Sequence, residues 1–511
     1  MRKPVTLKFI ALFSIFALTL SGCATEALKL APASPDQPWK PAQGKNASAE
    51  NTTGAKDFSI PSNPELALIS SPVSVDTRSS YDLAQLIDLA QRSNPTTRNA
   101  WEKARQAALA VGMVEATMLP IITANVIGGI QKTSTPVDVP LIGERTVNTT
   151  LKGVAPSVAL QWLVFDFGQR AALADAAKQV SFAANVTFNA MHQKVIFDVT
   201  RTYYEYSAAV AGHRIAEQTL RNSKAVLAAV QAKLNEGRAT TVELALAKQQ
   251  VAQSELRLVK SQGQQQNIYQ ALLASMGVNA MLNINVESSM KRPLPAKFEG
   301  ITQQAVETAL SRRPDVVASY AALQASKSGI KVAQAEFMPK VFVAGALAST
   351  NNRFEAGSLP SIGNQSSGAG VLIGATMPLY DSGLRAAQLK SAESTRNAAT
   401  ETFRKVQLDA VAEIVLASNL LKTSLAANKA AGVLVQTSAT AYDAALESYK
   451  NGLGTITIVN EANNALLDAK LAQTDARAAS LIAAANLAFF TGALTSSSSA
   501  VASLPGVSAG Q

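Results

Sequence analysis

One junction occurs twice in this chain and limits what the chain can fold into. The stretch LVFDFGQRAALADAAK changes within two residues from strand-like alternation to an alanine-rich helical pattern, and PLYDSGLRAAQLKSAE makes the same change 215 residues later. Asp166 and Gly168 in the first stretch correspond to Asp381 and Gly383 in the second. Aspartate accepts hydrogen bonds from the free N–H groups of a helix start, and glycine permits a sharp change of direction. We therefore predict two structural junctions, without catalytic function, at which a strand passes into a helix.

The junctions belong to a longer internal repeat. Residues 87–120 match residues 306–339 at an offset of 219, and Gly237 matches Gly452 at an offset of 215. Each copy is predicted to run helix, strand, loop, strand, very long helix, tip, helix. The sequence thus predicts a signal peptide (1–22), a tether rich in proline and serine (23–80), a first copy (81–295), a second copy (296–492) and a flexible C-terminal tail (493–511).

The strands are expected in two hairpins, over 118–166 and 338–381, each with a polar loop between its strands. Val158, Leu160, Trp162 and Val164 share one face of the strand before the first junction. The corresponding set in the second copy is Ile373, Ala375, Met377 and Leu379. Strands of about ten residues with one apolar face suit an outer-membrane barrel, and a half-buried soluble hairpin is the alternative. The expected strands span 120–130, 156–165, 339–349 and 370–380.

Four strands per chain are too few for a barrel with a usable interior, and open sheet edges cannot face lipid. The chain must therefore oligomerise, and a trimer with twelve strands in total is the simplest closed arrangement. The fold class predicted here is mainly α with β, in which a trimeric outer-membrane β-barrel is continued by a long α-helical coiled coil.

Two stretches, about 168–236 and 383–450, contain no proline and carry apolar residues at helical spacing. At a rise of 1.5 Å per residue, each helix would reach about 100 Å. Shorter helices are expected at about 81–117 and 239–276, so that two of them stacked end to end flank one long helix. Only 5% of the residues are aromatic and 16% are charged, a composition typical of long, closely packed helices.

The N-terminus carries an export signal. Three basic residues precede the apolar run FIALFSIFALTL, which is too short to span a bilayer, and LSGC follows it. This motif is similar to a bacterial lipobox, in which Cys23 would receive a diacylglyceryl thioether; an ordinary signal peptide is the alternative. Cys23 is the single cysteine of the chain, so a disulfide framework is excluded. Ala24 in the next position favours sorting to the outer membrane.

The junctions and the architecture together resemble the TolC/OprM outer membrane factor family over about residues 81–492. PLYDSG fits the family junction in full, whereas LVFDFG has leucine where proline is usual. The lipobox resembles that of the lipoprotein members. The resemblance implies a homotrimer in the outer membrane, lipid-anchored and extended into the periplasm by a helical tunnel. It also implies a periplasmic adaptor protein and an inner-membrane transporter of the RND or ABC type as partners.

The resemblance further implies that two helical tips dock on the adaptor protein. Family tips contain glycine, two further residues and then serine or threonine, a pattern that both copies reproduce here. Because a hydroxyl at this position can cap the returning helix, a plain helical hairpin is compatible with the same residues. The implied docking residues are Gly237, Arg238 and Thr240 in the first copy, and Gly452, Leu453, Gly454 and Thr455 in the second.

An entrance gate is also implied by the resemblance. Several family members carry carboxylates six and nine residues beyond the second tip glycine, and Ile458 and Glu461 occupy these positions here. The first copy has Glu243 and Leu246 there. The resemblance therefore implies only a single ring of carboxylates here, formed by Glu461. The alternative interpretation of Glu461 is a solvated charge on a coiled coil.

No other pattern indicates catalysis, a metal or a cofactor. His192 and His213 do not share a helix face and lack partners at metal-ligand spacing. The net charge is +10, but lysine and arginine are scattered, so we expect no nucleic-acid partner. We therefore expect no enzyme but a passive exit duct for small toxic compounds, in contact with outer-membrane lipids. The outer-membrane component of a type I protein secretion system is one alternative, and a structural coiled-coil lipoprotein without a pore is another.

Overall fold

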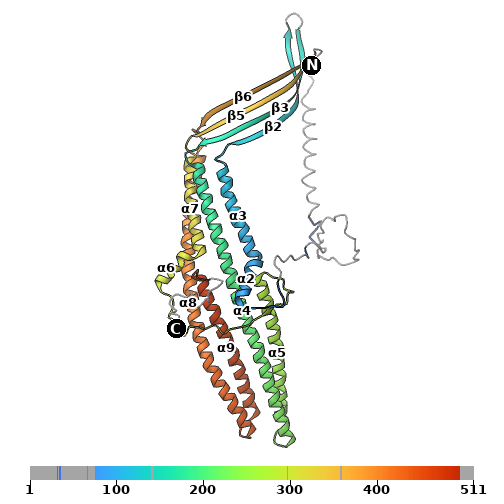
Figure 1. The fold of residues 1–511 in the computed structure, drawn as a ribbon, viewed down its shortest axis with the longest axis vertical. Helices are drawn as coiled ribbons and strands as arrows, with labels where there is room; N and C mark the ends of the chain where they lie inside the picture. Colours follow the sequence, from blue (N-terminus) through green and yellow to red (C-terminus); the bar gives the residue numbers. More distant parts are fainter. Residues whose placement is uncertain are drawn as a thin grey trace, which may run out of the picture. The chain divides into compact units, whose positions relative to one another are not determined.

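The computed structural model describes residues 31–32, 34–35, 66, 75–139, 143–295, 297–356 and 360–494. The chain divides into two compact units, Met1–Ser70 and Ser71–Gln511, and the helices and strands discussed below all belong to the second unit (Figure 1). The expected signal peptide, Cys23, most of the tether and nearly all of the C-terminal tail lie outside the described residues.

Long helices dominate the fold, and corresponding helices of the two copies have equal or nearly equal lengths. The longest helices, α4 (Gln169–Asn235) and α8 (Leu384–Lys450), have 67 residues each, close to the expected bounds. Helices α3 (Pro95–Ala116) and α7 (Pro314–Ala335) have 22 residues each. The remaining helices are α2 (Leu83–Ser93), α5 (Thr241–Met276), α6 (Gln303–Arg312) and α9 (Ile456–Phe490).

The expectation of one unbroken helix over 81–117 is wrong, because α2 ends at Ser93 and α3 begins at Pro95. Proline has no N–H to continue the hydrogen bonds of the preceding helix, but it is well suited to the first position of a new one. Asn94 caps the new helix, since its side chain accepts a hydrogen bond of 2.8 Å from the backbone N–H of Thr96. Pro314 interrupts the second copy in the same way between α6 and α7.

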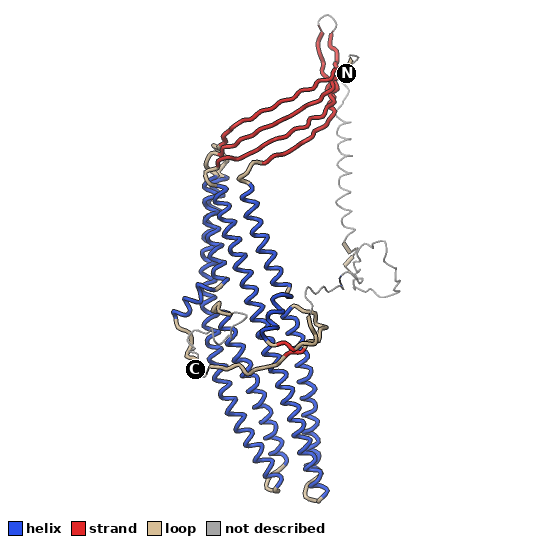
Figure 2. Tube along the Cα trace, viewed as in Figure 1, coloured by secondary structure: helices blue, strands red, loops and turns tan. Residues whose placement is uncertain are grey.

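Four strands form one antiparallel sheet, drawn in red in Figure 2, in the order β2-β3-β5-β6 that Figure 1 labels. The central pair, β3 with β5, joins a strand of the first copy to a strand of the second. A separate two-stranded parallel pair, β1 with β4, lies beside α2. The strands are β1 (Ser80–Tyr81), β2 (Ile121–Val139), β3 (Gly143–Phe165), β4 (Asn285–Val286), β5 (Lys340–Ala356) and β6 (Ile362–Thr376).

The strands are longer than the sequence pattern indicates, because most of each expected polar loop is paired strand. Residues 131–139 pair with 143–151, and Ser134 lies 2.7 Å from Asn148 across this hairpin, measured between side-chain oxygens. Polar residues occur on both faces in this part, so the regular apolar alternation that marks a half-buried strand is absent. At its C-terminal end β6 is shorter than expected and stops at Thr376. Met377 and Leu379 are therefore not part of the strand in which they were expected.

In the half of the sheet nearer the helices, the pairing register places most of the large apolar residues on one face. Val126 pairs with Pro156, and Val158 pairs with Ala124 on one side and with Leu347 on the other. Because side chains alternate along a strand, these residues share a face, which we call the apolar face. It also holds Ile122, Ile130, Val154, Leu160, Trp162, Val343, Val371 and Ile373.

The opposite face of this part of the sheet, which we call the small face, carries mainly small or polar residues, with Ile127, Phe342 and Leu372 among the exceptions. Ser157 pairs with Ala348, Ala159 pairs with Ala346, and Gly370 pairs with Ala346 from the other side. Few residues on either face are buried within one chain, and Val126, Val371 and Ile373 of the apolar face are each exposed by more than two thirds. A sheet with this exposure needs a partner on its apolar face and at its edges.

Helix α4 is the centre of the helical packing and contacts α2, α3, α5, α7 and α9, whereas α8 packs mainly on α7 and α9. In Figure 1, α3 lies along the half of α4 nearer the sheet and α5 along the other half, as the sequence predicts. By length and composition alone α8 could also cross a membrane, a test that core helices of soluble proteins pass as well. The main core joins α2, α4, α5 and α9 and includes Leu86, Val199, Tyr203, Leu273 and Ala485.

Candidate functional site

At the first junction, one aspartate organises the passage from β3 into α4. Gly168 is the N-cap residue of α4 and has a φ of 86°, a left-handed conformation that glycine adopts without strain. Asp166 accepts hydrogen bonds from the backbone N–H of Gly168 (3.3 Å) and of Arg170 (3.0 Å). The side-chain Nε of Arg170 also donates to Asp166, at 2.7 Å. Phe167, which lies between Asp166 and Gly168, also has a left-handed backbone conformation, with a φ of 53°.

The second junction has the same geometry between β6 and α8. Asp381 accepts hydrogen bonds from the backbone N–H of Gly383 (3.1 Å) and of Arg385 (3.2 Å), and from Nε of Arg385 (2.6 Å). Gly383 has a φ of 85°, and Ser382 has a φ of 55°. The aspartates thus make the helix-start hydrogen bonds that the sequence led us to expect, from a position two residues before the N-cap.

An arginine lies four residues after the aspartate in both copies, and the sequence pattern alone indicates no function for it. Arg170 also donates from Nη1 to the carbonyl oxygen of Thr117, at 2.7 Å, and so ties the end of α3 to the start of α4. Arg385 instead lies over the ring of Phe337, 5.2 Å from its centroid. In both copies the arginine connects the junction to the segment that follows the preceding helix, α3 or α7.

These ion pairs change the titration of the aspartates. Burial opposes ionisation of Asp166, but the hydrogen bonds and charge of Arg170 outweigh it and hold the pKa of Asp166 below its usual range. Hydrogen bonding from Arg385 has the same effect on the pKa of Asp381. Both carboxylates therefore remain charged at neutral pH and serve as fixed anions beside a helix start.

The tips are tight turns that depend on glycine. We call residues 236–240 the first tip and residues 451–455 the second. Gly237 has a φ of 71° and Gly452 a φ of 77°, both left-handed. At the first tip the N–H of Arg238 donates to the carbonyl of Lys233, at 2.8 Å, and the second tip repeats this bond from Leu453 to Ser448, at 2.9 Å. Each long helix thus ends with a glycine C-terminal motif.

Thr240 and Thr455 cap the returning helices α5 and α9. Thr240 accepts from the N–H of Glu243 at 3.2 Å, while the Glu243 carboxylate accepts from the N–H of Thr240 at 2.7 Å, which completes a capping box. Thr455 accepts from the N–H of Ile458 at 3.5 Å, without a carboxylate in return. Glu243 is therefore committed to a structural hydrogen bond.

The two helical hairpins pack against each other near their tips. Lys233 donates to the backbone carbonyl of Tyr449, and its Nζ lies 4.3 Å from the centroid of the Tyr449 ring. A small apolar core lies between the hairpins and consists of Val226, Val230, Ala247, Tyr442, Tyr449, Ile456, Val459 and Leu466. The tips of one chain are thus held together as a unit.

Other expected site residues lie on the exposed surface of this unit. Leu453 is 86% exposed and Ile458 is 52% exposed. Glu461 is exposed as well, and it shares a face of α9 with Asp468 and Asp475, which follow at intervals of seven residues. Arg238 forms an ion pair with Glu236. Within one chain the structure does not bring Glu461 together with Glu243, which is held in the cap of α5.

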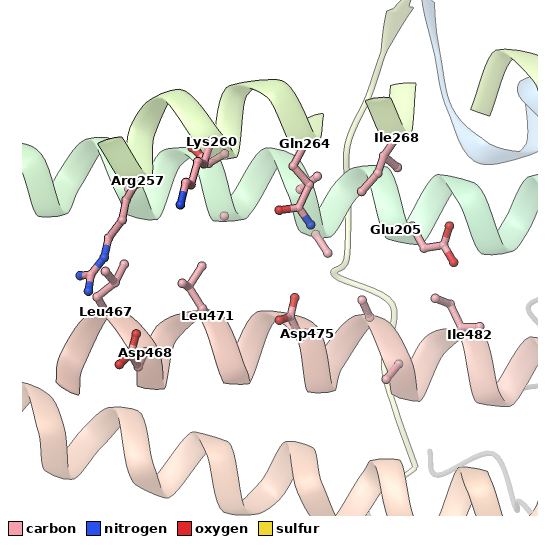
Figure 3. Close-up of a pocket in the computed structure, with 17 residues that line it drawn as sticks. Glu205, Arg257, Lys260, Gln264, Ile268, Leu467, Asp468, Leu471, Asp475 and Ile482 are labelled. Atoms are coloured by element: carbon pink, nitrogen blue, oxygen red, sulfur yellow. The ribbon is translucent and has the colours of Figure 1, made fainter. Parts of the chain in front are cut away.

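A cavity of about 500 Å³ lies between α4, α5 and α9 (Figure 3). Its walls carry opposite charges, with Arg257 and Lys260 on α5 and Asp468 and Asp475 on α9. Arg257 closes the end nearer the tips through a hydrogen bond of 2.7 Å from Nη1 to Asn464. No sequence pattern indicates this cavity, because its residues come from three helices that are distant in the chain.

Two segments of the chain, residues 86–278 and 305–493, match the family described as outer membrane efflux protein. The chain belongs to this family. The chain is 24% identical to outer membrane protein OprJ of Pseudomonas aeruginosa, over 89% of this chain and 88% of OprJ. It is 27% identical to the cation efflux system protein CusC of Escherichia coli, over 48% of this chain and 53% of CusC.

The fold is also shared with a solved relative. The crystal structure of the Campylobacter jejuni CmeC outer membrane channel matches with a TM-score of 0.66 at 19% identity, over 82% of this chain and 87% of CmeC. The two family matches begin within α2 and near the start of α6, so each covers one junction and one tip. The junctions and tips of this efflux protein thus lie inside the segments that define its family.

The junction predicts a pH-dependent stability. We expect Asp166→Asn to lower the free energy of unfolding by about 1 kcal/mol at pH 7, since a helix-start acceptor loses its charge. The pKa of Asp166 is lower in the folded state than in the unfolded state. Its contribution to the free energy of unfolding is therefore present above pH ~4 and is lost as the pH falls through the folded-state pKa. Thermal unfolding followed by circular dichroism measures the difference between variant and wild type, which should shrink at pH 3.

Asp175→Asn is the matched control, because Asp175 is exposed on the same helix. An equal loss of stability in both variants, or a difference between Asp166→Asn and wild type that is the same at pH 3 and pH 7, would contradict this account.

Proposed function

We propose that this protein is the outer-membrane exit duct of a tripartite export system and acts as a homotrimer. The observation that carries the proposal is the sheet, whose apolar face is exposed and whose outer strands β2 and β6 have no partner on one side among the described residues. Backbone groups at an open edge cannot remain unpaired in lipid. Three copies joined from β6 to β2 close a barrel of twelve antiparallel strands.

The dimensions of the sheet suit this arrangement. On β3 the apolar face runs from Val154 to Trp162, and on β2 it runs from Ile122 to Ile130. Nine residues in a strand extend about 30 Å, and a tilt of about 40° reduces the height to about 23 Å. Barrels of the outer membrane carry an apolar band about 25 Å tall. The small face, with its alanines, glycines and serines, then lines the interior.

The long helices continue this barrel as a periplasmic tunnel. Each of α4 and α8 has 67 residues and extends about 100 Å. A structural coiled-coil lipoprotein without a pore has no need of a sheet with one apolar face, so we favour the channel. Transport is passive, and the driving force comes from an inner-membrane transporter of the RND or ABC type, linked through a periplasmic adaptor.

The cargo we propose is a small toxic compound. Two relatives are named for export of small solutes, CusC as a cation efflux system protein and OpmQ as a pyoverdine export outer membrane protein. These two cargoes differ in chemistry although the ducts are related, so the family does not define the cargo. A type I secretion partner, with a polypeptide as cargo, is the alternative that the neighbouring genes would distinguish.

Cys23 is the proposed lipid anchor. The relative SilC of Salmonella typhimurium is named a probable outer membrane lipoprotein, at 24% identity over 61% of this chain. Two or more acyl chains hold a protein on a membrane stably, where one chain does not. The mass of the mature N-terminal peptide would report the acyl chains directly, and an unmodified Cys23 would overturn the assignment.

The trimer predicts a cross-link between copies. A cysteine in place of Asn125 on β2 and one in place of Ser366 on β6 lie at opposite edges of the sheet of one chain. Closure brings β2 of each copy beside β6 of its neighbour, so a scan of cysteines from 123 to 127 against Ser366→Cys should give a trimer-sized product at one register. Denaturing electrophoresis measures the product.

The control pairs Ser366→Cys with a cysteine at Ala155 on the central strand β3, which is paired on both sides along most of its length. That pair should give no cross-link between chains. Cross-linked products from the β2 positions that are no larger than a dimer, or no cross-linked product at any register, would contradict a closed trimer.

The tips predict the adaptor contact. Gly452→Val places a branched side chain at a φ of 77°, where such residues are strained, and should distort the second tip. Gly263→Val is the matched control, because a side chain at Gly263 meets open space and its φ is ordinary. In cells, a photo-cross-linker at Leu453 should capture the adaptor in the control and much less in Gly452→Val. If both capture it equally, the tips are not the docking surface.

The gate predicts ion selectivity. Three copies of Glu461 at a narrow entrance would attract cations and repel anions, because charged constrictions focus the electric field. Glu461→Gln should therefore reduce the preference for cations in planar-bilayer recordings. Glu243→Gln should change it less, because that carboxylate is bound in the cap of α5. An effect of Glu243→Gln alone would place the gate on the other hairpin, and no effect of either would leave Ile458 as the constriction.

A further inference from the structure

Three cations occupy the end of the apolar face that is remote from the helices. Lys152 on β3 pairs directly with Arg353 on β5, and Lys152 also pairs with Ile130 on β2. Lys132 lies two residues beyond Ile130 and thus on the same face. We call Lys132, Lys152 and Arg353 the basic row. It draws on three strands and both copies of the repeat.

The basic row is not neutralised within the chain. Lys152 forms an ion pair with Glu355, at 3.1 Å, and both side chains are substantially exposed. Among the described residues, Lys132 and Arg353 have no ion pair. Like charges that lie directly opposite each other on neighbouring strands destabilise a sheet. The pairing of Lys152 with Arg353 therefore has an electrostatic cost, which an anion bound between the two side chains would remove.

The basic row lies at a defined height on the apolar face. Lys152 precedes Trp162 by ten residues, and Arg353 follows Val343 by ten residues, while Trp162 and Val343 pair with each other. Ten residues extend about 34 Å along a strand, or about 25 Å in height at a tilt of about 40°. The basic row therefore lies one hydrocarbon thickness away from Trp162, where lipid headgroups begin.

We propose that the basic row binds the phosphate groups of anionic lipid headgroups in the outward-facing leaflet of the membrane. This inference rests on the proposed function, because the apolar face meets lipid only if the sheet closes into a membrane barrel. The helices extend from the opposite ends of the strands, so the basic row belongs to the leaflet away from the periplasm. Arginine binds phosphate through two parallel hydrogen bonds, and the two lysines add point charges.

A lipid phosphate suits the basic row better than a protein partner does. The row continues the apolar face without interruption on β2 and β3, where Ile130 and Val154 lie one step before Lys132 and Lys152. An occupant must therefore match an apolar surface and a row of positive charge at once. A phosphorylated lipid presents acyl chains and phosphate in that order. The trimer would carry three such rows, each with three cations and one carboxylate.

The test compares lipid binding by two purified trimers that differ equally from wild type in charge. The first variant combines Lys132→Gln, Lys152→Gln and Arg353→Gln. The matched control combines Arg404→Gln, Lys405→Gln and Lys422→Gln, three exposed positions on α8 that lie well beyond the end of β6 along the chain. Native mass spectrometry measures the lipid retained from mixed micelles containing lipid A, whose headgroup carries phosphates, or phosphatidylcholine, which is neutral overall.

We expect wild type and control to retain lipid A in preference to phosphatidylcholine, and the basic-row variant to retain at least tenfold less lipid A. Equal retention of lipid A by the variant and the control would overturn the proposal. So would displacement of the lipid by millimolar inorganic phosphate, since it would show a site for the free ion. Planar-bilayer conductance of wild type, variant and control tests the proposed duct separately from the proposed lipid site. If all three proteins form pores but retain lipid A equally, the proposed duct is supported and lipid binding by the basic row is contradicted.

Discussion

The ion pair at each junction is the interaction on which the rest of the fold depends. A strand finds its hydrogen-bond partners in neighbouring strands and a helix finds them within itself, so a direct passage between them leaves N–H groups without acceptors. Asp166 and Asp381 supply those acceptors, and the arginine four residues later fixes each carboxylate in place. Each junction needs two consecutive left-handed residues, and the second of them is glycine. The long helices can therefore follow the sheet closely, after three residues in the first copy and seven in the second.

The sequence predicted the features that depend on local pattern. The bounds of α4 and α8 follow from the absence of proline and from glycine at each end, and the shared apolar face follows from alternation in both copies. The break at Pro95 does not show in the pattern because helical spacing continues across it. The outer parts of β2 and β3 do not show because polar residues occur on both of their faces. The arginines of the junctions and the cavity beside Arg257 depend on contacts between distant elements, which no single stretch of sequence displays.

The tips show how two similar turns come to differ. Glu243 and Ile458 occupy equivalent positions in the two copies, yet Glu243 completes a capping box and Ile458 only donates its backbone N–H to Thr455. The second tip is therefore capped by its threonine alone, and its apolar side chain is free to face other surfaces. The acidic residues of α9 begin one turn later with Glu461. Equivalent sequence positions thus serve structure in one hairpin and leave surface chemistry available in the other.

The pairing of β3 with β5 has a consequence for the order of folding. Each helical hairpin closes between residues that are near in sequence, so the entropic cost of loop closure is small. Trp162 and Val343 can pair only after α4, α5, α6 and α7 have been synthesised, and pairings between residues so distant in the chain form slowly. The sheet therefore forms after the helices, while its apolar strands are still exposed to water. A chain of this design depends on protection from aggregation during that interval, until insertion and assembly bury the strands together.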